Sequence, residues 1–226
     1  MPEKSTRLDM SMMLAMHRAL RRDLANLADM ANLADLVALT DDTELARQLA
    51  SAPGWRLFRD FLHVHHAAED ETLWPTLHDC VEGSPAALEV LTAMELEHAA
   101  IDPLLEAIDA AVAEPGSGNQ PLGELIAELV RVVEDHLDHE EQEALPLIDA
   151  TLTDEQWLRF GADHRAKVGS QTPRWMPWIL DGALLEHTDI ILSRLPDAAR
   201  ASYYDQWQPA YRALDLWGPR DRESVP

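Results

Sequence analysis

The sequence has a single cysteine, Cys80, in 226 residues. One thiol cannot form an internal disulfide, which excludes a disulfide-held scaffold and fits a reducing compartment. No signal-peptide pattern is present near residue 1, and no long run of uncharged apolar residues could cross a membrane. We therefore expect a cytoplasmic protein with no membrane partner.

Basic residues are also scarce: the chain has 18 Lys and Arg against 41 Asp and Glu, and its formal net charge is -23. This acidity disfavours nucleic acid and anionic membranes as partners. It is compatible with a soluble protein that attracts cations, although solvated helix faces account for most of the acidic side chains. The sequence also has no Cys-x-x-Cys pair, no Gly-rich phosphate loop and no Ser/His/Asp set.

What the sequence does have is helical periodicity. Hydrophobic residues make up 46% of the chain and recur at three- and four-residue steps, as in amphipathic helices. We expect long helices at about residues 8–39, 53–80, 85–113 and 121–150, with a short helix at about 42–50. Pro75 should kink the second long helix. Short turns between long helices predict an all-α fold, an up-down-up-down four-helix bundle over residues 1–150.

Each long helix has one stripe of apolar residues that we expect to face inward. These are Met10, Met13, Leu20, Leu24, Leu27 and Ala31 on the first helix, Phe58, Leu62 and Leu73 on the second, Leu91, Met94, Ile101, Leu105 and Ile108 on the third, and Leu129, Val133, Ala144 and Leu147 on the fourth. Each inward stripe contains one histidine, and two stripes also contain a glutamate four residues later. These residues are His17, His65 with Glu69, His98, and His136 with Glu140. In antiparallel helices that rise about 1.5 Å per residue, their distances from the turns place all four histidines within about one turn of the same level. His17 and His65, for example, each lie about 24 residues from the turn near Asp41. His139 falls on a more polar face, so we expect it to be exposed.

A metal site explains this alignment better than four separate core histidines do. One His on an apolar face is most often a hydrogen-bonded core residue, but four at one level with two carboxylates are not expected by chance. Carboxylates buried without a cation would cost several kcal/mol each. Imidazole and carboxylate together are ligands that iron prefers. His66 and Asp70, also four residues apart, are possible additional ligands.

These motifs resemble the hemerythrin-like (HHE cation-binding) family of four-helix bundles, over about residues 8–150. The family pattern is a His on helix one, His-x-x-x-Glu on helix two, His on helix three and His-x-x-x-Glu on helix four, which the six residues match. The resemblance implies a non-haem di-iron centre. In such a centre the two glutamates bridge the irons, and an oxo or hydroxo group completes the bridge.

The chain departs from the oxygen-carrying hemerythrins that it resembles. Those proteins have two histidines four apart on helix three and an Asp five residues after the helix-four His. Here Met94 and Asp102 flank His98 at the first spacing, and the helix-four carboxylate comes four residues after its His. One nitrogen ligand is missing, which leaves an open or water-filled position or recruits one of the additional candidates. An open position is typical of a reactive site, so we do not expect reversible oxygen carriage.

Two functions of different classes fit this centre. The first is redox handling of a small oxidant, meaning peroxide, nitric oxide or dioxygen, at a pair of irons. The alternative is an oxygen-, iron- or redox-sensing module that binds its ligand without turnover. A single zinc or nickel ion held for structure is a third interpretation.

Residues 151–226 form an extension that contains all three tyrosines and five of the seven tryptophans. We expect helices there at about residues 153–167, 173–194 and 196–216. The extension should pack across one end of the bundle or along its side and cover apolar surface. A homodimer interface and a lid over the iron entrance are the alternatives. His164 and His187 have no carboxylate at ligand spacing in an apolar context, so neither is included in the site.

Overall fold

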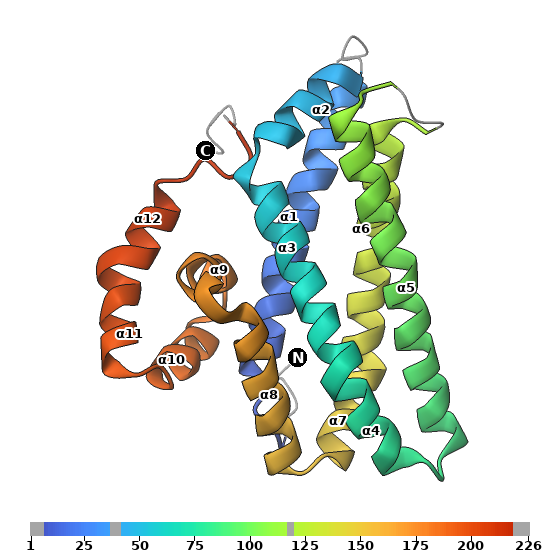
Figure 1. The fold of residues 1–226 in the computed structure, drawn as a ribbon, viewed down its shortest axis with the longest axis vertical. Helices are drawn as coiled ribbons and strands as arrows, with labels where there is room; N and C mark the ends of the chain where they lie inside the picture. The colour runs from blue at the N-terminus through green and yellow to red at the C-terminus, as the bar shows by residue number, and fades with distance from the viewer. Residues whose placement is uncertain (1–6, 37–41, 117–119, 219–226) are drawn as a thin grey trace, which may run out of the picture.

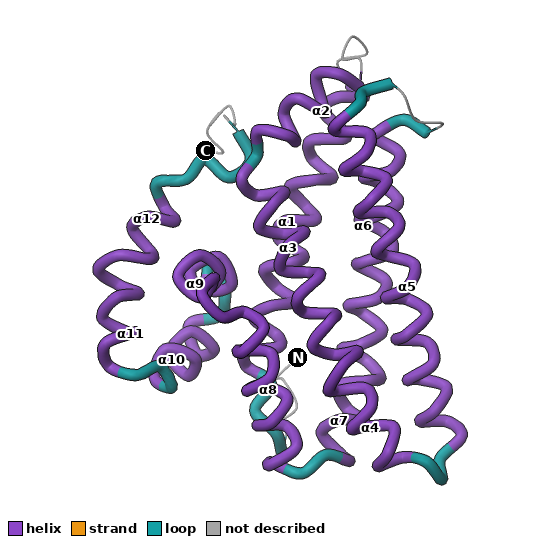
Figure 2. The backbone as a smooth tube through the Cα atoms, viewed as in Figure 1, coloured by secondary structure: helices purple, strands orange, loops and turns teal. Residues whose placement is uncertain are grey.

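A computed structural model describes residues 7–36, 42–116 and 120–218. Helices make up nearly all of the regular structure in this part of the chain, which contains no strand (Figure 2). The predicted all-α fold is therefore confirmed. The long helical segments stand side by side as a bundle, and the extension lies along one side of it (Figure 1).

The helices of the bundle follow the predicted segments closely. They are α1 (Ser11–Leu36), α2 (Asp42–Ser51), α3 (Pro53–Ala68), α4 (Trp74–Val81), α5 (Pro85–Ala113), α6 (Leu122–His139) and α7 (Leu145–Thr151). Because α1 packs on α3 and α6, and α5 packs on the same two helices, the four rods enclose one core. The predicted end of the first helix, at about residue 39, lies outside the described residues.

Both glutamates of the predicted site begin a short π-helix. The first, η1, covers Glu69–Leu73 between α3 and α4, and the second, η2, covers Glu140–Ala144 between α6 and α7. Pro75 and Pro146 follow in the first turn of the next helix. Proline donates no N–H and crowds the carbonyl four residues earlier, and a wider turn relieves both problems. Where the sequence predicts a kink at Pro75, the structure has a π-helix directly before the proline.

The predicted inward stripes form the core. Every apolar stripe residue predicted on the first three long helices is buried, including Leu20, Leu62 and Met94, which have no exposed surface. On the fourth helix the stripe is correct as far as Ala144. Beyond it Ile148 is buried, whereas Leu147, predicted to face inward, is only half-buried. The wider turn of η2 shifts the helical register there by one position.

The extension is made of shorter pieces. They are α8 (Asp154–Val168), the 3₁₀ turn η3 (Gly169–Gln171), α9 (Thr172–Leu180), α10 (Leu185–Ser193), α11 (Asp197–Ser202), the π-helix η4 (Tyr203–Trp207) and α12 (Gln208–Arg212). Thr153 and Gln156 form a capping box at the start of α8, as expected for a helix beginning there. The single helix predicted over 173–194 is wrong, because Gly182, with φ of 77°, separates α9 from α10. The last predicted helix ends at Arg212 rather than near residue 216.

The extension packs along the side of the bundle. Helix α8 contacts α3, while α9 and α10 contact α1. Phe61 on α3 lies at the centre of this interface, with its ring centroid 5.4 Å from that of Trp175 and 4.9 Å from that of Trp178. The chain then returns to the start of α3, where Gly54 N donates a 2.8 Å hydrogen bond to Leu216 O (Figure 1).

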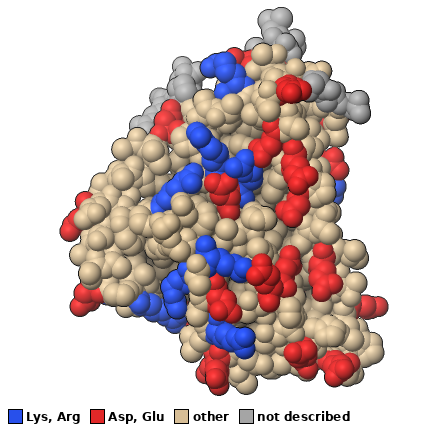
Figure 3. Space-filling model, in the orientation of Figure 1, with Lys and Arg blue, Asp and Glu red and all other residues tan. Residues whose placement is uncertain are grey.

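In the view of Figure 3, acidic side chains are spread over the bundle between large areas of uncharged surface. Several ion pairs join the extension to the bundle. In two of them, Lys167 Nζ lies 2.6 Å from Glu71 Oε2, and Arg174 Nη1 lies 3.7 Å from Asp60 Oδ2. Exposed pairs contribute about 0–1 kcal/mol each, so aromatic packing dominates the docking. In the described part of the chain no helix is long and apolar enough to span a membrane.

Candidate metal centre

Five histidines and two glutamates meet inside the bundle, and all seven are buried. His17 comes from α1, His65 and His66 from α3, Glu69 from η1, His98 from α5, His136 from α6 and Glu140 from η2. Neighbouring residues of a helix point about 100° apart, so the consecutive histidines of α3 reach different sides of the centre. The sequence predicted the other six residues as ligands and named His66 as an additional candidate.

These residues form two groups, and within each group one ligand atom per residue lies within 4.8 Å of the others. The first group is His17, His65, Glu69 and Glu140, and the second is His66, His98 and His136. In the second group His98 Nε2 lies 3.2 Å from His136 Nε2, and the rings of His66 and His98 stack at a centroid distance of 3.9 Å. The nitrogen atoms therefore converge on two neighbouring points, each of which can hold a metal ion.

The two carboxylates lie between the groups. Glu69 Oε1 is 3.3 Å from His65 Nε2, and its Oε2 is 3.7 Å from His98 Nε2. Glu140 Oε2 is 3.1 Å from His17 Nε2 and 3.9 Å from His136 Nε2. Each carboxylate thus approaches a histidine of both groups, which is the position that a bridging ligand needs.

The inward polar atoms of the centre are buried without partners. All four carboxylate oxygens of Glu69 and Glu140, and the Nε2 atoms of His17, His65 and His66, have no hydrogen bond in the described structure. Unsatisfied buried polar atoms are rare and costly in folded proteins. Metal ions bound between the two groups would satisfy these atoms together, so the residues present fit a metal centre.

Burial and mutual proximity shift the protonation of these groups. Burial raises the pKa of Glu69 well above its usual value, and the nearby Glu140 adds to the rise. Burial lowers the pKa of His65 well below its usual value. Burial would also lower the pKa of His17, but Glu140 beside it raises that pKa to about 9. A metal ion would favour ionised carboxylates and neutral imidazoles, so it must displace the proton on His17.

Three of the histidines are held from outside by a carboxylate on Nδ1. The pairs are His17 with Glu141 Oε1 at 2.9 Å, His98 with Asp70 Oδ1 at 2.7 Å, and His136 with Glu97 Oε2 at 2.9 Å. A carboxylate at Nδ1 fixes both the ring orientation and the tautomer, and it leaves Nε2 free for a metal. Histidine–carboxylate pairs of this kind are what metal sites use beyond their direct ligands.

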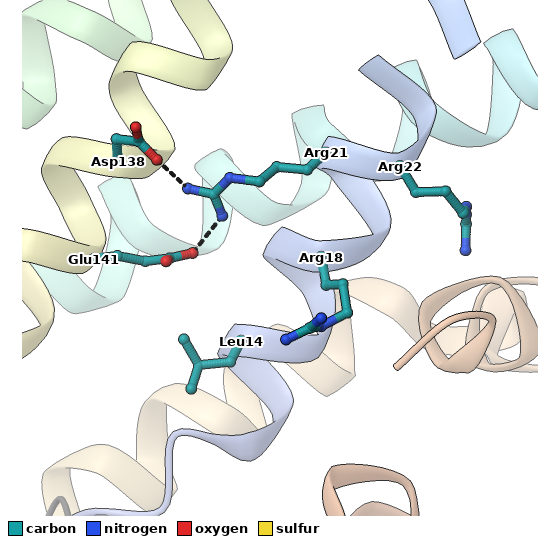
Figure 4. A pocket seen from close by; sticks show the side chains of 6 residues that line it. All are labelled: Leu14, Arg18, Arg21, Arg22, Asp138 and Glu141. Atoms are coloured by element: carbon teal, nitrogen blue, oxygen red, sulfur yellow. Dashed lines mark hydrogen bonds and ion pairs between the residues drawn. The ribbon is translucent and has the colours of Figure 1, made fainter. Parts of the chain in front are cut away.

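Glu141 is itself held by Arg21, as Figure 4 shows. Arg21 Nη1 lies 2.5 Å from Glu141 Oε1, and its Nη2 lies 2.7 Å from Asp138 Oδ1. Partial burial would raise the pKa of Glu141, but the hydrogen bonds from His17 and Arg21 lower it to about 2. Glu141 is therefore an anion that stabilises the outward side of His17.

The structure places two residues differently from what the sequence predicted. Asp70, an additional ligand candidate, lies outside both groups and accepts a hydrogen bond from His98 instead. His139, expected to be exposed, is partly buried, and its Nδ1 lies 2.7 Å from Glu97 Oε1. Glu97 and Glu141 were missed by the sequence argument. One feature of the sequence could have indicated them: each is the direct neighbour of a predicted ligand along the chain.

Fold and site together define a four-helix-bundle protein with His and Glu groups that can hold metal ions. The family model of the hemerythrin HHE cation binding domain matches residues 9–148. The chain therefore belongs to the hemerythrin HHE cation-binding family, which confirms the resemblance noted from its motifs. No curated protein and no solved structure matches the chain.

Proposed function

We propose that the chain is a non-haem di-iron protein that binds a small oxidant, meaning peroxide, nitric oxide or dioxygen, and processes it by redox chemistry. The observation that carries this proposal is the position of Glu69 and Glu140, two buried carboxylates between two sets of imidazoles. Shared carboxylates are suited to a pair of cations rather than to one. The mixture of imidazole and carboxylate ligands favours iron.

The two sides of the centre have unequal nitrogen donors. The second group would hold its metal by His66, His98 and His136, whereas the first would use only His17 and His65, with both glutamates bridging. An oxo or hydroxo group would complete the bridge. When bound, the iron pair supplies one-electron redox steps. The side with fewer protein ligands leaves an open position, as expected of a reactive site.

The surrounding residues control what reaches that position. Met13, Leu62 and Met94 lie one helical turn from the histidines of their own helices and have at most 1% of their surface exposed. These apolar side chains exclude bulk water and favour small neutral ligands over ions. The outer carboxylates, such as Glu141 on His17, keep the imidazoles oriented while a ligand enters.

Iron content and turnover test the proposal together. The purified, iron-loaded protein should contain two irons per chain and change its visible spectrum on addition of peroxide or nitric oxide. It should then consume many equivalents of one of these oxidants. A reaction that stops after one oxidation would favour the sensing or binding alternative. One zinc or nickel ion per chain, with no iron taken up, would overturn the di-iron proposal.

A matched pair of variants links the result to the centre. His98→Leu should lose metal, because His98 is the one residue that α5 contributes to the two groups. Met94→Leu, one helical turn away, keeps a similar apolar volume and should retain both metals. If His98→Leu kept two irons, α5 would not belong to the centre.

A further inference from the structure

His65 differs from the three histidines that have a carboxylate on Nδ1. Its Nδ1 is buried and has no hydrogen-bond partner in the described structure. Histidines that bind a metal through one nitrogen almost always donate the other N–H to an acceptor. The outward nitrogen of His65 therefore needs an acceptor that the bundle does not supply.

The nearest imidazole outside the two metal-binding groups comes from the extension. His164 on α8 is 8% exposed, and its ring centroid lies 5.9 Å from that of His65, with the two planes at 78°. The Nε2 of His164 is also buried and without a partner in the described residues. Two orphaned ring nitrogens thus belong to neighbouring rings whose planes are nearly perpendicular. His164 is not within either metal-binding group, so its place is that of a supporting residue.

The extension holds His164 in this place from several sides. The ring of Phe61 lies 6.0 Å from the ring of His65 and 6.0 Å from that of His164, and Phe160 packs on His164 at 6.2 Å. Polar contacts fix α8 to η1 on either side of His164. Thr72 Oγ1 donates a 3.4 Å hydrogen bond to Asp163 Oδ2, and Lys167 Nζ donates a 2.6 Å hydrogen bond to Glu71 Oε2.

We propose that His164 is a positioning residue of the metal centre: its Nε2 accepts a hydrogen bond from the Nδ1–H of His65 when the metal is bound. This inference rests on the proposed metal centre. An N–H···N hydrogen bond of about 3 Å forms if the two rings turn so that these nitrogens face each other and approach somewhat more closely than the present 5.9 Å between centroids. A neutral imidazole suits this buried aromatic pocket, because burial among apolar rings penalises a charged group. The extension thereby supplies a residue that orients a ligand of the metal centre.

Three variants separate this role from simple packing. His164→Phe keeps an aromatic ring but loses the acceptor, and its iron affinity, measured by competition with a chelator, should fall roughly 10–100-fold. His164→Gln restores an acceptor oxygen and should recover most of that loss. Trp157→Phe removes a contact of the same helix with the bundle, the 3.0 Å hydrogen bond from Trp157 Nε1 to Asp9 O, without touching the acceptor. It should leave the affinity within about twofold of the unaltered protein. The unfolding of each metal-free variant should be measured in parallel. An affinity of His164→Phe equal to that of Trp157→Phe would overturn the proposal.

A measurement on the unaltered chain complements the variants. In protein loaded with diamagnetic zinc and labelled with ¹⁵N in its histidines, the rings of His65 and His164 should show a coupling across the N–H···N bond. Absence of that coupling would also overturn the inference. If the unaltered protein bound no metal, the proposed function would fail instead. Metal binding that is indifferent to His164→Phe rejects only the role of His164.

Discussion

The indole Nε1 of Trp178, on α9, donates a 2.7 Å hydrogen bond to Oδ2 of Asp23, on α1, and both residues are completely buried. Arg22 Nε donates to Oδ1 of the same carboxylate at 3.0 Å, so the buried charge is compensated within the interface. Arg22 also donates to the backbone oxygens of Trp178 and Asp181, at 2.9 and 2.6 Å. The extension is therefore held by buried polar contacts of Asp23 and Arg22 as well as by aromatic packing.

Trp178→Phe should test this attachment. The substitution removes the donor to Asp23 and leaves a cavity, so we expect the free energy of unfolding to fall by about 2–4 kcal/mol. Limited proteolysis within the extension should become faster. Trp207→Phe is the control, because Trp207 is only half-buried, and it should cost less than about 1 kcal/mol. Equal losses in the two variants would contradict a special role for the Trp178 contact.

Gly54→Ala should weaken the return of the chain to α3. A Cβ at residue 54 would collide with the indole of Trp217 and would lie 2.8 Å from Leu216 O. Overpacking of this kind should lower the free energy of unfolding by roughly 1–3 kcal/mol, and urea unfolding measures the loss. Gly161→Ala is the control, and it should raise the free energy of unfolding instead. Nothing lies within 4 Å of its added Cβ, and alanine is the better residue within a helix by about 0.5–1 kcal/mol. If both variants were stabilised, the close approach at Gly54 would be wrong.

The pH dependence of the extension should reflect Tyr211. Burial raises the pKa of Tyr211 above its usual value of 10.0, and the 2.8 Å hydrogen bond that its hydroxyl donates to Asp181 adds to the rise. The folded state thus keeps a phenol proton that the unfolded state loses. This contribution to stability is fully present below about pH 10 and is lost as the pH rises further.

Tyr211→Phe should therefore make the free energy of unfolding fall less steeply above about pH 10 than in the unaltered protein. Urea unfolding at increasing pH measures the slope. Tyr204→Phe is the matched control, since Tyr204 is 53% exposed and its substitution removes no buried hydroxyl. If the slope were unchanged in Tyr211→Phe, another group would cause the loss of stability at high pH.

The sequence predicted most of the bundle because its helices are long and their apolar stripes are clean. Residues such as Leu20 and Met94 fall on one face at regular steps, and the histidines share those faces. The prediction failed where the period changes. Leu147 was placed inward on a regular α-helical count, whereas η2 shifts the register and buries Ile148. A π-helix depends on crowding between proline and an earlier carbonyl, which a count of apolar positions does not register.

The supporting residues were harder to predict, because contacts between helices decide them. Glu97 and Glu141 lie one position away from the inward stripes, where solvated carboxylates are common. Only the packing of neighbouring helices turns them toward a histidine. His164 is harder still, since nothing near it along the chain indicates that α8 lies against α3. Its orphaned nitrogen becomes informative only once His65 is seen beside it.

Glu69→Gln should separate stability from metal binding. In the metal-free protein the buried carboxyl of Glu69 has a raised pKa and no hydrogen bond, so its replacement should leave the free energy of unfolding unchanged or raise it by roughly 1–2 kcal/mol. The extra stability that added iron gives the unaltered protein should be lost. Glu143→Gln, which changes a mostly exposed carboxylate, should keep that iron-dependent stabilisation. Undiminished stabilisation by iron in Glu69→Gln would remove this residue from the centre.

His66→Leu and Asp70→Ala should have different effects, although the sequence named both residues as additional ligand candidates. His66 contributes a ligand atom to the second group, so its loss should reduce the metal content by about one ion per chain. Asp70 only supports His98, so Asp70→Ala should retain both ions but bind one of them roughly 10–100-fold more weakly. His63→Leu, an exposed neighbour on α3, serves as the control and should behave as the unaltered protein does. Loss of an ion in Asp70→Ala but not in His66→Leu would make Asp70 the ligand, and the second group would then contain two histidines instead of three.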